Sequence, residues 1–128
     1  YYNKEIDNQN YLDRCKYIID NNRDLNKIVI TTNITVDDLN NYFNEYFQVE
    51  LDDGGIINDS NVTLTISSGN SLVIHTNGTL TLESCTLQID EGGSLQIDGI
   101  FNMTNGEIIY DYDSSVLFSD SSEINITL

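Results

Sequence analysis

The fold of this chain is decided by the stretch from Asn61 to Asp98, which reads NVTLTISSGNSLVIHTNGTLTLESCTLQIDEGGSLQID. A four-residue phrase with apolar residues at its second and fourth positions recurs there about every eight residues. Because successive side chains of a strand point to opposite faces, each copy predicts a short strand with two apolar side chains inside. The five copies are Thr63–Ile66, Ser71–Ile74, Thr79–Leu82, Thr86–Ile89 and Ser94–Ile97.

Four looser copies follow and begin at residues 100, 107, 115 and 123. Single spacings between the nine starts range from 6 to 8 residues, yet every third start is separated by 21 or 23. Three successive phrases thus span a nearly constant number of residues, which indicates that three strands complete one turn of a closed circuit. Gly, Asn, Asp and Ser lie at its corners. The sequence therefore predicts a mainly β fold, a three-sided parallel β-solenoid of about three turns. Turns of this length exceed three hexapeptides and favour right-handed winding. A meander sandwich also contains short alternating strands, but it does not require three successive strands to span a constant number of residues.

The first 60 residues differ in pattern from the repeats. We interpret 1–60 as a small α/β N-terminal cap and assembly segment, and 61–128 as the solenoid. The elements expected in the cap are a helix with its apolar stripe over Tyr11–Ile19, a strand over Lys27–Val36, a short helix capped by Asp37–Asp38 and a turn at Asp52–Gly55.

The repeat pattern resembles that of the parallel β-helix proteins of cell surfaces and fibres, which include fungal and bacterial adhesin domains and phage tail parts. The resemblance covers residues 61–128. It implies the architecture alone, and no functional residue of those families is transferred to this chain.

Charge is distributed very unevenly along the 128 residues. The five Lys and Arg residues all lie in the first 27 positions, together with five acids, whereas the remaining chain carries 16 acids and the whole net charge of −16. A body without cations cannot neutralise phosphates, so we expect neither nucleic acid nor an anionic membrane as a partner. Acidity of this kind also simply favours solubility. No apolar run approaches the length of a membrane span, so no membrane insertion is expected.

Asparagine sequons indicate a secreted protein. Only one of the ten asparagines before residue 50 lies in an N-x-S/T sequon, but five of the seven after it do, at expected corners or outward positions. We therefore expect N-linked glycans and an extracellular location, although an Asn- and Thr-rich chain also produces sequons incidentally. The six candidate sites are Asn33, Asn58, Asn61, Asn77, Asn102 and Asn125. Asn102 and Asn125 are expected on adjacent turns about 4.8 Å apart, where two full glycans would be crowded.

Cys15 and Cys85 are the only cysteines. In a secreted protein the pair suggests one disulfide that ties the N-terminal helix to the solenoid. Two buried thiols and a bridge between subunits remain as alternatives. The chain opens on Tyr1 rather than Met, so we expect a processed protein or a fragment.

Candidate catalytic groups are few, and we predict no enzymatic activity. His75 is the single histidine and is expected in a corner, which leaves no triad and no His-based metal cluster. The carboxylate pairs Asp52/Asp53 and Asp111/Asp113 lie in turn-like strings, where solvated corners are the simpler interpretation.

No cofactor is expected, and the only metal considered is calcium. Corner acids favour Ca²⁺ weakly, since neither an EF-hand loop nor a glycine-rich calcium repeat is present. The acids concerned are Asp90, Glu91, Asp111, Asp113, Asp120 and Glu123.

Two functions fit these observations. In the first, the chain is a subunit of an extracellular filament or surface layer, because the last strand phrase has no polar cap and an open solenoid end invites another copy of itself. In the second, it is an adhesin or carbohydrate-binding module of a longer cell-surface protein whose repeats continue. The candidate assembly residues are Val73 and Leu117 in an outward row and Ile124, Ile126 and Leu128 at the open end.

Overall fold

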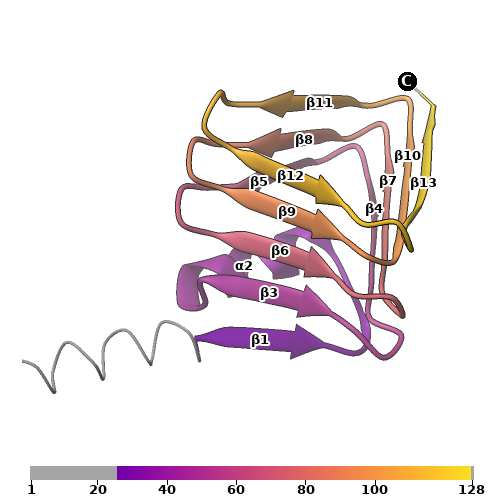
Figure 1. Ribbon diagram of the computed structural model, residues 1–128, viewed down its shortest axis with the longest axis horizontal. Coiled ribbons are helices and arrows are strands. Elements are labelled where there is room, and N and C mark those ends of the chain that lie inside the picture. The colour runs from indigo at the N-terminus through magenta and orange to yellow at the C-terminus, as the bar shows by residue number, and fades with distance from the viewer. Residues whose placement is uncertain (1–25, 128) are drawn as a thin grey trace, which may run out of the picture.

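The computed structural model describes residues 26–127 and shows three parallel β-sheets wound around one core (Figure 1). Sheet A has the strand order β1-β3-β6-β9-β12, sheet B the order β13-β10-β7-β4-β2, and sheet C the order β11-β8-β5. Each neighbouring pair within these sheets is parallel, as in a solenoid. The strands are β1 (Lys27–Ile30), β2 (Asn33–Ile34), β3 (Gln48–Leu51), β4 (Ile56–Ser60), β5 (Thr63–Ile66), β6 (Ser71–Ile74), β7 (Thr79–Glu83), β8 (Thr86–Ile89), β9 (Ser94–Ile97), β10 (Ile100–Thr104), β11 (Glu107–Tyr110), β12 (Ser115–Phe118) and β13 (Glu123–Thr127).

The predicted grouping of the strands in threes is confirmed. The nine phrases begin where β5 to β13 begin, and every third strand lies in the same sheet. Registers show it directly: Thr63 lies beside Thr86, and Ser71 lies beside Ser94. The mainly β, parallel solenoid architecture expected from the repeats is therefore the fold of the described chain.

The stack of coils begins earlier than the repeats indicated. Strands β3 and β4 precede residue 61, yet they pair with β6 and β7 in sheets A and B. Strands β1 and β2 extend the same sheets by one further coil, so the solenoid has about four turns rather than three. The single strand expected over Lys27–Val36 is wrong, because the chain bends at Thr32 and passes from sheet A to sheet B there. The helix expected over Tyr11–Ile19 lies outside the described residues.

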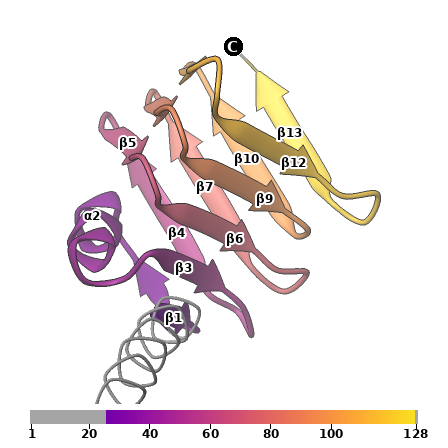
Figure 2. The same ribbon diagram turned by 60° about the vertical axis from the view of Figure 1, so that its left-hand side comes forward.

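Helix α2 (Val36–Glu45) takes the place of a strand in the first coil. It follows a strand of sheet B and precedes one of sheet A, which is the position that sheet C strands occupy in later coils (Figure 2). Its N-cap is Thr35 rather than Asp37 or Asp38 as expected. The Thr35 hydroxyl accepts from the Asp38 N–H at 3.1 Å and the Asp38 carboxylate accepts from the Thr35 N–H at 3.1 Å, which forms a capping box.

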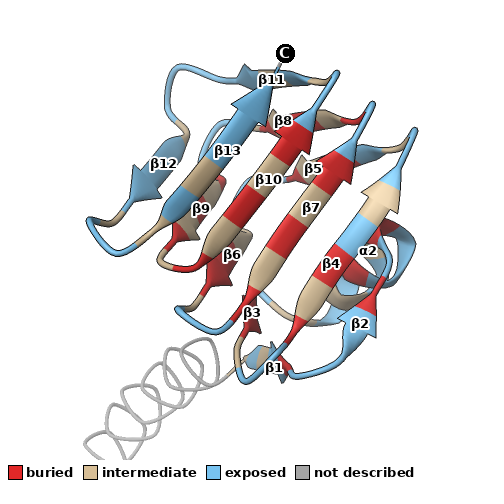
Figure 3. Cartoon of the chain, turned by 90° about the vertical axis from the view of Figure 1, so that its right-hand side faces the viewer, coloured by how far each residue is buried: buried red, intermediate tan, exposed pale blue. Residues whose placement is uncertain are grey.

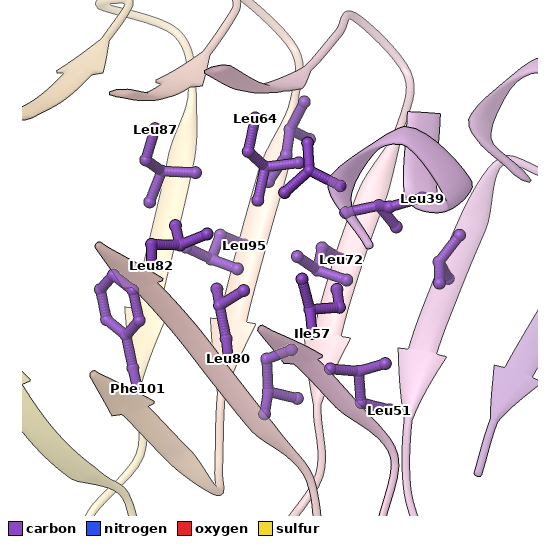
Figure 4. Packing of buried hydrophobic residues seen from close by; sticks show 14 of the residues in the cluster. Leu39, Leu51, Ile57, Leu64, Leu72, Leu80, Leu82, Leu87, Leu95 and Phe101 are labelled. Carbon is purple, nitrogen blue, oxygen red and sulfur yellow. The ribbon is translucent and has the colours of Figure 1, made fainter. Parts of the chain in front are cut away.

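The core is a set of stacked aliphatic rows inside the coils. The apolar residues at the second and fourth positions of β5 to β10 are at most 1% exposed, as the alternation predicted. Leu39 of α2 joins the same cluster, and Phe101 is its largest member (Figure 4). Among residues 26–127, no buried side-chain nitrogen or oxygen lacks a hydrogen-bond partner. Packing of this kind, with each side chain held by the coils on both sides, stabilises the fold and fixes the positions of the outward residues.

The coils approach each other closely at the corner between sheets A and B, and glycine permits the approach. A Cβ added to Gly78 would lie 2.7 Å from the Leu51 carbonyl oxygen and 2.9 Å from the Leu51 Cβ. The turn expected at Asp52–Gly55 lies at the same corner one coil earlier and is present.

Candidate functional site

The predicted sequons gather on one side of the solenoid. Asn33, Asn58, Asn102 and Asn125 lie in β2, β4, β10 and β13, which are all strands of sheet B. The other two occupy the corners that bound this sheet, Asn77 before β7 and Asn61 after β4. Five of the six are exposed, and Asn102 is half-buried. Sheets A and C carry none of the six, so glycans attached at these sites would shield one face and leave two uncovered.

A hydrogen-bonded row runs across this face. The outward residues Asn58, Thr81, Asn102 and Asn125 are direct neighbours in successive coils. The Asn125 amide donates to the Asn102 side-chain oxygen at 2.8 Å, and the Asn102 amide donates to the Thr81 hydroxyl at 3.2 Å. The predicted adjacency of Asn102 and Asn125 is confirmed. Both amide nitrogens to which sugar would be attached are engaged in this row, whereas Asn58 makes no such bond with residues 26–127.

The C-terminal end of the solenoid exposes residues that are core residues in the earlier coils. Val116 and Phe118 of β12 occupy the inward row of Leu95 and Ile97, yet they are 39% and 43% exposed. Figure 3 shows the same change in β13, which is largely exposed although β10 beside it is buried at alternate positions. The exposed end surrounds a hollow of about 490 Å³ lined by Ile108, Tyr110, Ser114, Val116, Phe118 and Ile126.

Of the two candidate assembly residues in the outward row of sheet A, only Leu117 is exposed as expected. Val73 is only 8% exposed, whereas Leu117 in the same row is 56% exposed. Ile124 is half-buried against the core, and Ile126 is 37% exposed. Leu128 lies outside the described residues. Among these candidates, the exposed apolar side chains therefore lie on β12 and β13.

The N-terminal end is closed by α2. Val36 and Leu39 of the helix are fully buried, and Tyr42 and Phe43 pack beside the core cluster. Asp59, which occupies an inward position of β4, accepts the Val36 N–H at 2.9 Å. This bond satisfies a donor in the first turn of the helix and places a negative charge at its positive end. The first coil thus presents a polar helix where the last coil presents an apolar hollow.

A cluster of charged and polar side chains joins three coils on sheet A. The Glu50 carboxylate of β3 lies 3.2 Å from Lys27 Nζ of β1 and 2.5 Å from His75 Nε2 after β6, and it accepts from Gln48 Nε2 at 2.6 Å. Burial by itself raises the pKa of Glu50. The hydrogen bonds from His75, Gln48 and Lys27 and the charge of Lys27 outweigh it, so the pKa lies below its ordinary value of 4.5.

Sequence reasoning missed this cluster because it assigned no strand to residues 48–51. The signal was present: Gln48–Leu51 has the same apolar spacing as the later phrases, and it begins 23 residues before Ser71. His75, expected alone in a corner, is instead paired with a buried carboxylate. The arrangement stabilises the contact between β1, β3 and the corner after β6.

Cys85 is only 2% exposed and forms no disulfide with any of residues 26–127. Its Sγ lies 3.3 Å from the Glu83 carbonyl oxygen and 3.6 Å from that of Asp59. The expected disulfide partner, Cys15, lies outside the described residues, so the pairing stays a prediction.

The acidic corners do not converge on a common position. Within residues 26–127, no group of three or more His, Cys, Asp and Glu side chains is arranged to hold a metal ion. Asp111 instead accepts the Glu91 N–H at 3.0 Å, which ties two stacked corners together. The described part of the chain also contains no helix that is long and apolar enough to cross a membrane.

Comparison with known proteins found no matching family model, no matching curated protein and no matching solved structure.

Proposed function

We propose that this chain is a secreted, N-glycosylated structural protein, a subunit that assembles through the end of its solenoid into an extracellular filament or surface layer. The observation that carries the proposal is the exposed coil interior of β11, β12 and β13. An apolar surface of this kind, bordered by unpaired strand edges, is a template for another chain.

The distribution of sequons supports the extracellular part of the proposal. Glycans on sheet B and its corners would solubilise one face without covering the coil ends. A polymer of stacked solenoids would then carry its sugars along one side of its length.

Two measurements on the full chain, secreted from a eukaryotic host, test the proposal. Sedimentation velocity over a hundredfold concentration range should show a concentration-dependent shift to larger species, with ordered filaments or sheets in electron micrographs. Glycopeptide mass spectrometry should find sugar on sheet B sequons. A glycosylated chain that sediments as a monomer throughout would count against assembly and favour the adhesin or carbohydrate-binding module, in which further coils cover the end. A complete absence of sugar would remove the glycoprotein part.

A further inference from the structure

Two sheets of the solenoid end in unpaired strands at both ends of the stack. Sheet A runs from β1 to β12 and sheet B from β2 to β13, and both sheets are parallel throughout. Within residues 26–127, the outer edges of these four strands have no strand partner. In a second copy translated along the solenoid axis, β1 would lie beside β12 of the first copy and β2 beside β13. Both pairs would be parallel, as all the pairs within the sheets already are.

We propose that the partner at the C-terminal end is the first coil of a second copy of this chain, with β12 paired to β1 and β13 paired to β2. This inference rests on the proposed function, because it specifies the contact by which the subunits assemble. The contact is head-to-tail, so it does not close on itself and builds a filament.

The strand register fits this contact. Strands β1 and β12 have four residues each, with the inward side chains at the second and fourth positions. Pairing Lys27 with Ser115 places Ile28, which is half-buried, beside Val116. It places Ile30, which is already only 5% exposed under the cover of the first coil, beside Phe118. These pairs would continue the inward rows that run through all five strands of sheet A.

The outward row of sheet A gives an independent argument. It consists of Val29, Glu50, Val73, Gln96 and Leu117. Its two end residues are aliphatic and exposed, Val29 by 48% and Leu117 by 56%, whereas Val73 inside the row is 8% exposed. In the stacked arrangement Leu117 of one copy becomes the direct neighbour of Val29 of the next, and each gains the cover that Val73 already has.

The third side of the contact is shaped for a helix. Sheets A and B have five strands but sheet C has only three, with α2 in the first coil. A helix is about 10 Å across, which is roughly two strand spacings of about 4.8 Å. The α2 helix of the next copy would therefore occupy the space above β11, beside the hollow lined by Ile108 and Tyr110.

A sugar on Asn125 is compatible with this contact. Strand β2 has only two residues, which would pair with Glu123 and Ile124 of β13 if the register of sheet B continues. Asn125 then has no strand neighbour from the next copy, and a glycan there would have room.

Charge opposes the contact and makes it dependent on salt. Glu107, Asp111 and Asp113 border the open end, and Asp37 and Asp38 lie in the first turn of the incoming helix. Added salt screens this repulsion, since the Debye length falls from about 30 Å at 0.01 M to about 8 Å at 0.15 M. Association should therefore strengthen with salt.

Cysteine cross-linking between two single variants tests the register. Val29→Cys and Leu117→Cys chains, each in a Cys15→Ser background, are prepared separately, mixed at 0.15 M salt and oxidised gently. Neighbouring strand positions are within disulfide reach. We expect the yield of the 29–117 disulfide to be roughly tenfold or more higher than the yield of the 29–96 disulfide in a control mixture of Val29→Cys and Gln96→Cys chains. Docking raises the effective concentration of the neighbouring thiols. A further Phe118→Asp substitution in the Leu117→Cys chain should abolish the 29–117 cross-link. Ile109→Asp, at an outward position of the same coil, should leave the cross-link in place.

The outcomes separate the register from the proposed function. A 117–117 disulfide without the 29–117 product would mean that the C-terminal ends meet each other, which overturns the head-to-tail contact. Concentration-dependent filaments without the 29–117 product would overturn the register and leave the proposed function standing. A chain that remains monomeric and forms no cross-link overturns both.

Discussion

At the N-terminal end of the solenoid, α2 covers the coil interior with Val36 and Leu39, which are fully buried. At the C-terminal end, Val116 and Phe118 continue the inward rows of sheet A but remain about two-fifths exposed. The residue types are similar at both ends, and only the cover differs. An aliphatic row in this fold is thus a core when a coil or helix lies on both sides of it, and an exposed apolar surface when one side is open. Substitutions in the two regions should therefore differ in their effect on stability.

Removal of one aromatic side chain should have very different effects in the two regions. Phe101→Ala should lower the free energy of unfolding by about 3–5 kcal/mol, because the side chain is fully buried and leaves a cavity. Phe118→Ala should cost less than about 1 kcal/mol, because the side chain is 43% exposed in the isolated chain. Denaturant unfolding at low protein concentration measures both values. Equal losses would mean that the open end is already covered in the monomer.

The close approach at the glycine corner should be the next most sensitive point. Gly78→Ala places a methyl group 2.7 Å from the Leu51 carbonyl oxygen, so the coils must separate locally, at a cost of about 1–3 kcal/mol. Ser122→Ala at the corresponding position before β13 is the matched control and should cost about 0.5–1.5 kcal/mol through the lost hydrogen bond to the Ser119 carbonyl oxygen. Thermal unfolding of the two variants distinguishes them. A Gly78→Ala protein as stable as the wild type would contradict the tight stacking of this corner.

The helical cap can be weakened without a change in the core. Asp59→Ala removes the acceptor for the Val36 N–H and should cost about 1 kcal/mol. Asp120→Ala, at an exposed corner of the last coil, should change the stability by less than about 0.5 kcal/mol. Hydrogen exchange should locate the loss of protection in the first turn of α2. Unchanged exchange of the Val36 amide would show that Asp59 does not anchor the helix.

Acid should loosen the N-terminal half through Glu50. Its pKa in the folded state lies below 4.5, so the folded state binds fewer protons than the unfolded state in that range. The contribution of Glu50 is therefore complete above about pH 4.5 and is lost as the pH falls through the folded-state pKa. Glu50→Gln should show a smaller loss of stability than the wild type between about pH 5 and 3, measured by denaturant unfolding. Parallel curves for the two proteins would contradict the ionised Glu50 carboxylate that pairs with Lys27.

The strand repeat was readable in advance because inward and outward residues alternate with a period of two. From β5 onward, the phrase starts and the grouping in threes were predicted correctly. The first coils were missed, although Lys27–Ile30 and Gln48–Leu51 have the same apolar spacing and begin 21 residues apart. The β-branched residues after Lys27 predicted one continuous strand, although the chain turns at Thr32. Strand propensity does not indicate where a chain turns.

Three features can be read from the order of residues alone: the alternation of strand side chains, the number of residues in each circuit and the positions of the sequons. These features depend on local spacing, which the order of residues contains. Three others follow from the folded chain: four sequon asparagines lie on one sheet, Glu50 contacts Lys27 and His75, and Val116 and Phe118 are exposed. Each of these depends on which coil lies above another, and contacts between residues more than 20 positions apart arise only when the circuit closes.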